Sequence, residues 1–103
     1  MNNEQIDNTD YYLLPNGKYL EDFILYKKLN FAWGSALKYW WRAGKKDGES
    51  AEKDLAKYEH YVRFIAARMF HGDMLHDKFR RVALEQRVRI IVMRYAEEAR
   101  AWK

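Results

Sequence analysis

Four polar side chains recur at helical spacing between Trp33 and Gly48. They are Ser35, Lys38, Arg42 and Lys45, at positions i, i+3, i+7 and i+10, which share one face of a helix with 3.6 residues per turn. Three of them are cations, and a row of cations on one face suits phosphate. We therefore expect an anion site here, while the same pattern also describes a solvated basic face beside core tryptophans.

Aromatic rings accompany these cations. Tyr39 and Trp41 flank the row and offer a base or sugar a surface on which to stack. An adjoining apolar stripe, suited to holding the helix against a core, consists of Trp33, Ala36, Leu37 and Trp40. The segment thus combines a phosphate-binding face, stacking surfaces and a buried face in a single helix.

Length and composition limit the class of protein. The chain has 103 residues, which predicts one domain over residues 1–103. Aromatic residues make up 17%, including four Trp and eight Tyr, more than a small monomeric core readily buries. This excess favours self-association or a ligand pocket.

Charge and cysteine content point to the partners and the compartment. The net charge of +4 favours anionic partners, but acidic residues are interspersed and no long basic run exists, so we do not expect nucleic acid as the partner. The chain has no cysteine, which excludes disulfides and thiolate metal sites. The polar start and the short apolar runs predict neither a signal peptide nor a membrane span, which indicates a cytoplasmic protein.

Helical periodicity dominates the chain. Residues 1–18 read as an irregular arm closed by a turn at Leu14-Pro-Asn-Gly17. Apolar residues then recur at helical spacing in four segments, at 19–28, 31–43, 50–71 and from Asp73 or Asp77 to Trp102. No strand pattern competes with them. The sequence predicts an all-α fold, a compact bundle of about four helices.

Two apolar stripes define the faces of the later helices. The first, expected in the core, is Leu55, Tyr58, Val62, Ile65 and Met69. The second is Leu84, Val88, Ile91, Tyr95 and Trp102. A long final helix with such a stripe suits a seam between subunits, so we expect a homo-oligomer, a dimer or a tetramer.

Two motifs closely resemble a small helical family of tailed bacteriophages. The first is Gly34-Ser-Ala-Leu-Lys38-Tyr39-x-x-Arg42-Ala-Gly44-x-Lys46, and the second is Glu52-x-Asp54-Leu55-x-Lys57-x-x-x-Tyr61. The family signature is G-N-x-x-K-Y-x-x-R-x-G-x-K followed by E-D-L-x-K-A-x-x-Y-L, and one member is a nucleotide kinase without a P-loop. With Tyr12 and the segment 19–23, the resemblance covers about residues 11–64 and leaves out the last forty or so.

The resemblance implies a phage protein that handles nucleotides in the cytoplasm of the infected host. The family's Asn is Ser35 in this chain, and its His beside Tyr12 is Tyr11. These two changes remove the side chains best suited to proton transfer or base recognition, which favours binding over catalysis. Related small phage proteins act as sponges that trap the nucleotide signals of bacterial immunity.

We therefore expect an anti-defence sponge that sequesters a phosphorylated, or cyclic, nucleotide without altering it. The expected ligand-binding residues are Tyr12, Ser35, Lys38, Tyr39, Trp41, Arg42, Lys45 and Lys46, with no catalytic residue. One alternative is a deoxynucleoside monophosphate kinase, which needs Mg²⁺ and requires Glu52 and Asp54 to face the cations. Another is an inhibitor that binds a host defence protein directly. The sequence does not identify the nucleotide or the host pathway.

Two clusters of residues raise the question of a metal. The first consists of His60, His71, Asp73, His76 and Asp77, whose spacing matches no compact ligand pattern. The second pairs Glu49, Glu52 and Asp54 with Glu97 and Glu98, as in a magnesium site on paired helices. Acidic residues at a helix start are explained by capping alone. We expect no metal and no cofactor.

Overall fold

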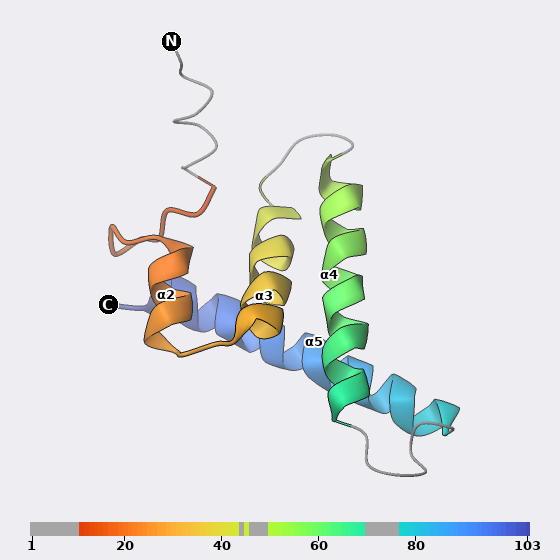
Figure 1. The fold of residues 1–103 in the computed structure, drawn as a ribbon. Helices are drawn as coiled ribbons and strands as arrows, with labels where there is room; N and C mark the ends of the chain where they lie inside the picture. The colour runs from red at the N-terminus through yellow and green to blue at the C-terminus, as the bar shows by residue number, and fades with distance from the viewer. Residues whose placement is uncertain (1–10, 44, 46–49, 70–76) are drawn as a thin grey trace.

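The computed structural model describes residues 11–43, 45, 50–69 and 77–103. These residues form four helices, α2 (Leu20–Tyr26), α3 (Phe31–Ala43), α4 (Ser50–Arg68) and α5 (Lys78–Ala101) (Figure 1). Within the described ranges there is no strand, only an isolated bridge between Leu13 and Tyr19. The all-α bundle of four helices predicted from the sequence is confirmed.

The helices α3 and α4 lie side by side and run in opposite directions, and α5 crosses behind both (Figure 1). The short helix α2 lies beside α3, near the end of α5. Asn30 starts α3, because its side-chain oxygen accepts a hydrogen bond from the Trp33 amide at 3.0 Å. The face of α3 that points away from α5 is left between the N-terminal arm and α4.

The core draws on every helix and on the arm. Ala36, Leu37 and Trp41 of α3 are buried, and Trp33 and Trp40 pack against them as expected. The other buried apolar residues are Leu14, Leu20, Phe23, Tyr58, Val62, Ile65, Ala66, Val88, Val92, Ala96 and Ala99. The tryptophans of α3 therefore hold that helix in place and fix where its polar face points.

The start of α4 differs from the predicted stripe. Tyr58, Val62 and Ile65 are buried as expected, but Leu55 is 39% exposed and Asp54 is 3% exposed. Position 54 lies one helical turn before Tyr58 and faces α3, where Arg42 offers a cation. The prediction of Leu55 as a core residue is wrong, because an ion pair rather than an apolar contact occupies this end of the interface.

The long helix α5 buries its predicted stripe within this chain. Val88 is fully buried, and Leu84, Tyr95 and Trp102 pack against the same core. Ile91 is only partly exposed. Val88 is therefore not free to form the expected seam between subunits, and the other four residues retain only part of their surface for it. None of the described helices is both long and apolar enough to cross a membrane.

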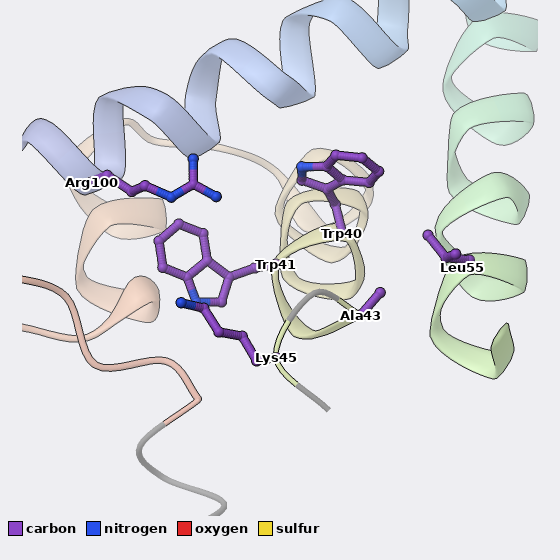
Figure 2. Close-up of a pocket in the computed structure, with 6 residues that line it drawn as sticks. All are labelled: Trp40, Trp41, Ala43, Lys45, Leu55 and Arg100. Atoms are coloured by element: carbon purple, nitrogen blue, oxygen red, sulfur yellow. The ribbon is translucent and has the colours of Figure 1, made fainter. Parts of the chain in front are cut away.

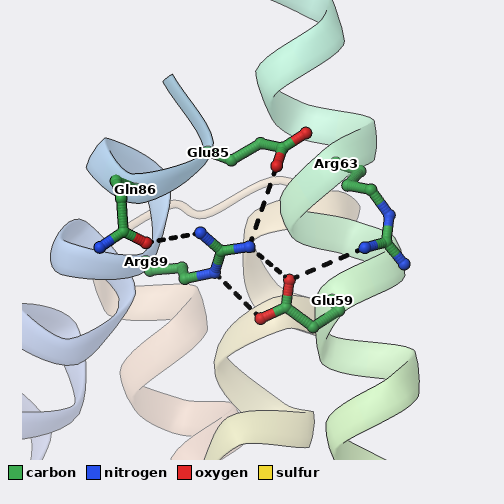
Figure 3. A network of polar contacts seen from close by, with 5 residues as sticks. All are labelled: Glu59, Arg63, Glu85, Gln86 and Arg89. Atoms are coloured by element: carbon green, nitrogen blue, oxygen red, sulfur yellow. Dashed lines mark hydrogen bonds and ion pairs between the residues drawn. The ribbon is translucent and has the colours of Figure 1, made fainter. Parts of the chain in front are cut away.

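An ion-pair network joins α4 to α5 (Figure 3). The Arg89 guanidinium donates to both carboxylate oxygens of Glu59, from Nε at 3.0 Å and from Nη2 at 2.7 Å. Glu85 lies 3.9 Å from Arg89, and Arg63 lies 4.0 Å from Glu59. This bidentate pair fixes the crossing of the two helices.

Residues 11–18, the described part of the N-terminal arm, are irregular as predicted and close at the expected turn. The Gly17 amide donates to the Leu14 carbonyl at 2.9 Å, and Gly17 has a φ of 87°, which glycine adopts without strain. The indole N–H of Trp41 donates to the Tyr11 carbonyl at 2.7 Å. The arm is thereby tied down along α3.

Candidate functional site

The polar row of α3 lies on the face that the core leaves open. Ser35, Lys38 and Arg42 are all half-buried on this helix. The Lys38 Nζ lies 5.4 Å from the centre of the Tyr12 ring, a cation–π contact to the arm. Tyr12 therefore folds back onto the cationic row, together with which it was expected to bind the ligand.

A polar cluster joins the arm, α3 and α4. Arg42 Nε lies 3.4 Å from Asp54 Oδ2. Burial raises the pKa of the Tyr12 phenol, while the nearby Arg42 guanidinium acts to lower it. The Tyr12 hydroxyl, Arg42 Nε and Asp54 Oδ2 are each buried without a hydrogen-bond partner. Arg42 Nε and Asp54 Oδ2 face each other as an ion pair, so the Tyr12 hydroxyl is the atom with bonding capacity for a polar group that enters the cluster.

Aromatic rings continue this face onto α4. The Tyr39 and Tyr61 rings are stacked, with centres 6.1 Å apart and planes 10° apart. Lys57 Nζ lies 5.4 Å from the centre of the Tyr39 ring. Phe31, which is 78% exposed, meets the Tyr61 ring edge to face at 5.9 Å. Tyr39 and Arg42 are three residues apart on α3, so the aromatic rings adjoin the polar cluster.

Trp41 and Lys45 lie apart from this face. Trp41 is only 4% exposed, and the Arg100 guanidinium of α5 lies 5.1 Å from the centre of its ring. The Lys45 Nζ sits over the same ring at 5.3 Å. The predicted row thus divides, with Lys38 and Arg42 toward the arm and α4 and with Lys45 beside Trp41. Lys46 lies outside the described residues.

The two carboxylates that the kinase alternative requires do not lie on the same side of α4. Asp54 faces Arg42, whereas Glu52 is exposed and lies two positions away, on a different side of α4. Among the described residues, no three His, Asp or Glu side chains are grouped so that they can hold a metal ion. His60 packs against the rings of Tyr61 and Phe64. Glu49, His71, Asp73 and His76 lie outside the described residues.

Some residues of this face were not among the expected binding residues. Lys57 and Tyr61 both belong to the second motif, so their spacing on one side of a helix was a usable signal. Arg100 lies beside Trp41 rather than on this face, and the sequence carries no signal for it, since it is one of six arginines in the last segment. Asp54 was explained by capping or, in the kinase alternative, was required to face the cations, and the structure shows it paired with Arg42.

The comparisons with known proteins give one match. A family model described as a protein of unknown function, DUF3310, matches residues 2–63. This span contains every described residue of the α3–α4 face and ends before α5. No curated protein and no solved structure matches the chain.

Proposed function

We propose that this chain, which belongs to the DUF3310 family, binds a phosphorylated nucleotide on the face between the arm, α3 and α4. The observation that carries the proposal is the junction of two parts. One is the polar cluster of Tyr12, Arg42 and Asp54 with Lys38 beside it, and the other is the stacked pair of Tyr39 and Tyr61. A nucleotide has the same two parts, an anionic phosphate and a flat base.

The phosphate end of the ligand binds at Lys38 and Arg42. Both cations are half-buried, so a phosphate between them is less screened by water than it is on an open surface. Arg42 presents a planar fork of donors that suits phosphate oxygens. The buried Tyr12 hydroxyl, which has no hydrogen-bond partner, supplies a further donor.

The base binds at the aromatic end. Tyr39 and Tyr61 are partly exposed, and Phe31 extends the aromatic surface into solvent. A stacked base gains about 1–3 kcal/mol on such a ring, and the gain depends little on its identity. Lys57 adds a cation above Tyr39, and its charge favours an anionic ligand on this face.

The role that we propose is sequestration. Binding at this face needs no proton transfer, and the resemblance to phage proteins that trap the nucleotide signals of bacterial immunity supports such a sponge. Its place of action is the cytoplasm of the infected host, and its ligand is a mononucleotide or a cyclic oligonucleotide.

One observation favours the nucleotide kinase as a second candidate. The Asp54 carboxylate lies beside Arg42 at the polar cluster, and a kinase needs a carboxylate near its cations to hold Mg²⁺ or to accept the proton of the attacking oxygen. Glu52 does not accompany it. A kinase built on this face would therefore use Asp54 rather than Glu52 as a carboxylate, with Mg²⁺ that arrives with ATP.

One experiment separates the two roles. The protein is incubated with nucleoside and deoxynucleoside monophosphates and with cyclic dinucleotides, with and without ATP and Mg²⁺, and is then denatured so that the ligand can be analysed. Sequestration predicts retention of one ligand and its recovery intact. Conversion of a monophosphate to its diphosphate establishes the kinase, and retention of no nucleotide rejects both.

A matched pair of variants ties the result to this face. Lys38→Gln removes the cation over Tyr12, whereas Lys78→Gln removes an exposed cation at the start of α5. Retention is expected to fall in the first variant and to be unchanged in the second. Equal loss in both variants points to nonspecific charge attraction.

A further inference from the structure

We propose that the surface around Trp41, between α3, α5 and the arm, is a second and separate site, which binds an organic anion with an apolar body. Lys45 and Arg100 bring two cations to one indole, at 5.3 Å and 5.1 Å from the ring centre. Figure 2 shows both side chains directed to this ring, one from each side of it.

The indole is a fixed part of this site. Trp41 is 4% exposed, and its N–H is bonded to the Tyr11 carbonyl at 2.7 Å. The ring is therefore held in one orientation, and the two exposed cations lie over it. The position of the ring is set before any ligand arrives, which lowers the ordering cost of binding.

Two hollows meet at these three residues. One, of about 340 Å³, is completed by Trp40, Ala43 and Leu55 (Figure 2). The other, of about 320 Å³, is completed by Leu13, Leu14 and Pro15 of the arm. Each has the size of a small-ligand pocket. Apart from the two cations, their walls are apolar, so they suit a ligand with an apolar group beside its anion.

The charges of the site are uncompensated among the described residues. No described carboxylate forms an ion pair with Lys45 or Arg100, whereas Lys27 has Glu98 at 2.9 Å and Arg89 has Glu59. Both cations belong to the wall of each hollow, and a phosphate dianion is attracted by them more strongly than a monoanion is. A phosphate or phosphonate group therefore matches the site better than a monoanion does.

This site is independent of the proposed nucleotide face. Lys38 and Arg42 contact Tyr12 and Asp54, and neither lines either hollow. Arg100 lies outside the span that the family model matches, whereas the nucleotide face lies within it. Loss of binding at one site therefore leaves the other intact.

Phenyl phosphate is a suitable probe, because it joins a phosphate dianion to an apolar ring. The ¹H–¹⁵N signal of the Trp41 indole N–H, assigned by its absence in Trp41→Phe, is followed during titration. We expect a saturable shift of this signal. Inorganic phosphate is expected to bind at least about fivefold more weakly, because it leaves the apolar walls uncovered.

Variants locate the binding. Arg100→Gln and Lys45→Gln are each expected to raise the Kd for phenyl phosphate at least about fivefold, the effect of losing one charge-assisted contact. Arg94→Gln, an exposed position on α5, is the matched control and is expected to leave the Kd unchanged. Backbone spectra of all variants confirm that they remain folded, and Arg100→Lys is expected to retain part of the affinity.

Three results overturn the proposal. They are the absence of a saturable shift, an unchanged Kd in both Arg100→Gln and Lys45→Gln, and loss of the Trp41 shift in Lys38→Gln. The last result places the phosphate at the nucleotide face. Normal phenyl phosphate binding by a protein that retains no nucleotide rejects the proposed function but not this second site.

Discussion

Arg42 of α3 and Asp54 of α4 face each other with Nε and Oδ2 3.4 Å apart, and both atoms are buried without a hydrogen bond. The Asp54 side chain is 5% exposed, and that of Arg42 is 34% exposed. The pair therefore joins the two helices and also forms the floor of the proposed phosphate site. A change in Arg42 acts on stability and on binding together, so the two effects have to be measured separately.

Arg42→Ala is predicted to destabilise the fold. The substitution leaves the Asp54 carboxylate buried without its cation, at a cost of about 1–3 kcal/mol in the free energy of unfolding. Urea denaturation followed by circular dichroism measures the loss. Addition of Asp54→Asn to the Arg42→Ala variant removes the buried charge and is predicted to recover part of the lost stability. A double variant as unstable as the sum of the two single variants contradicts the pairing.

The Glu59–Arg89 pair predicts a pH dependence of stability. Arg89 holds the pKa of Glu59 below its ordinary value of 4.5, so the carboxylate stabilises the folded state above that pH. The contribution is lost as the pH falls through the lowered pKa of the folded state. Both side chains are partly exposed, which limits the effect to about 1 kcal/mol.

Denaturation of the wild type and of Glu59→Gln, measured between pH 3 and pH 7, tests this dependence. The difference in stability between the two proteins is expected to shrink as the pH falls below about 4.5. A difference that stays constant over the range assigns the effect of the substitution to packing. Glu97→Gln, an exposed position on α5, is the matched control.

Asp77 is predicted to stabilise the start of α5. Its side chain accepts a hydrogen bond from the Arg80 amide at 3.1 Å, and the loss of such a cap costs about 1 kcal/mol. Asp77→Ala is expected to show that loss in thermal or urea unfolding, whereas Asp77→Asn, which retains the acceptor, is expected to show little. An equal loss in both variants assigns the effect to charge rather than to capping.

Periodicity predicted the helices because each apolar stripe is long. It failed at position 55, where one ion pair decides which side of α4 faces α3 and no apolar pattern carries that information. The start of the last helix at Asp73 or Asp77 and the turn that includes Gly17 were predicted because both depend only on neighbouring residues, and the structure shows a cap at Asp77. How α5 crosses α3 depends on contacts between distant residues, and so the contact of Arg100 with Trp41 was not predictable.

Helical spacing also predicted part of the candidate site. Helical spacing placed Lys38, Arg42 and Ser35 on one face, as the structure shows. Helical spacing also added Lys45 to that row, although α3 ends at Ala43 and the Lys45 side chain lies over Trp41. The spacing rule fails where the helix ends.

Self-association remains a prediction, and the structure changes where we expect it. The exposed apolar residues of α5 are Phe79, Val82, Ile90 and Met93, at 88%, 49%, 47% and 43% exposure. They lie on the side opposite the core, at helical spacing. Light scattering is expected to show a dimer or tetramer, and replacement of Ile90 and Met93 by Glu is expected to yield a monomer. A monomeric wild type at micromolar concentration contradicts the prediction.

Calorimetric titration with the panel of monophosphates and cyclic dinucleotides tests the central claim most directly, when the wild type is compared with Lys38→Gln and the folded Arg42→Lys. We predict that the wild type binds at least one nucleotide, that Lys38→Gln raises its Kd about tenfold, and that Arg42→Lys also weakens binding, because a lysine lacks the fork of donors. If no nucleotide binds, or if all three proteins bind the same nucleotide equally well, the α3–α4 face is not a nucleotide site.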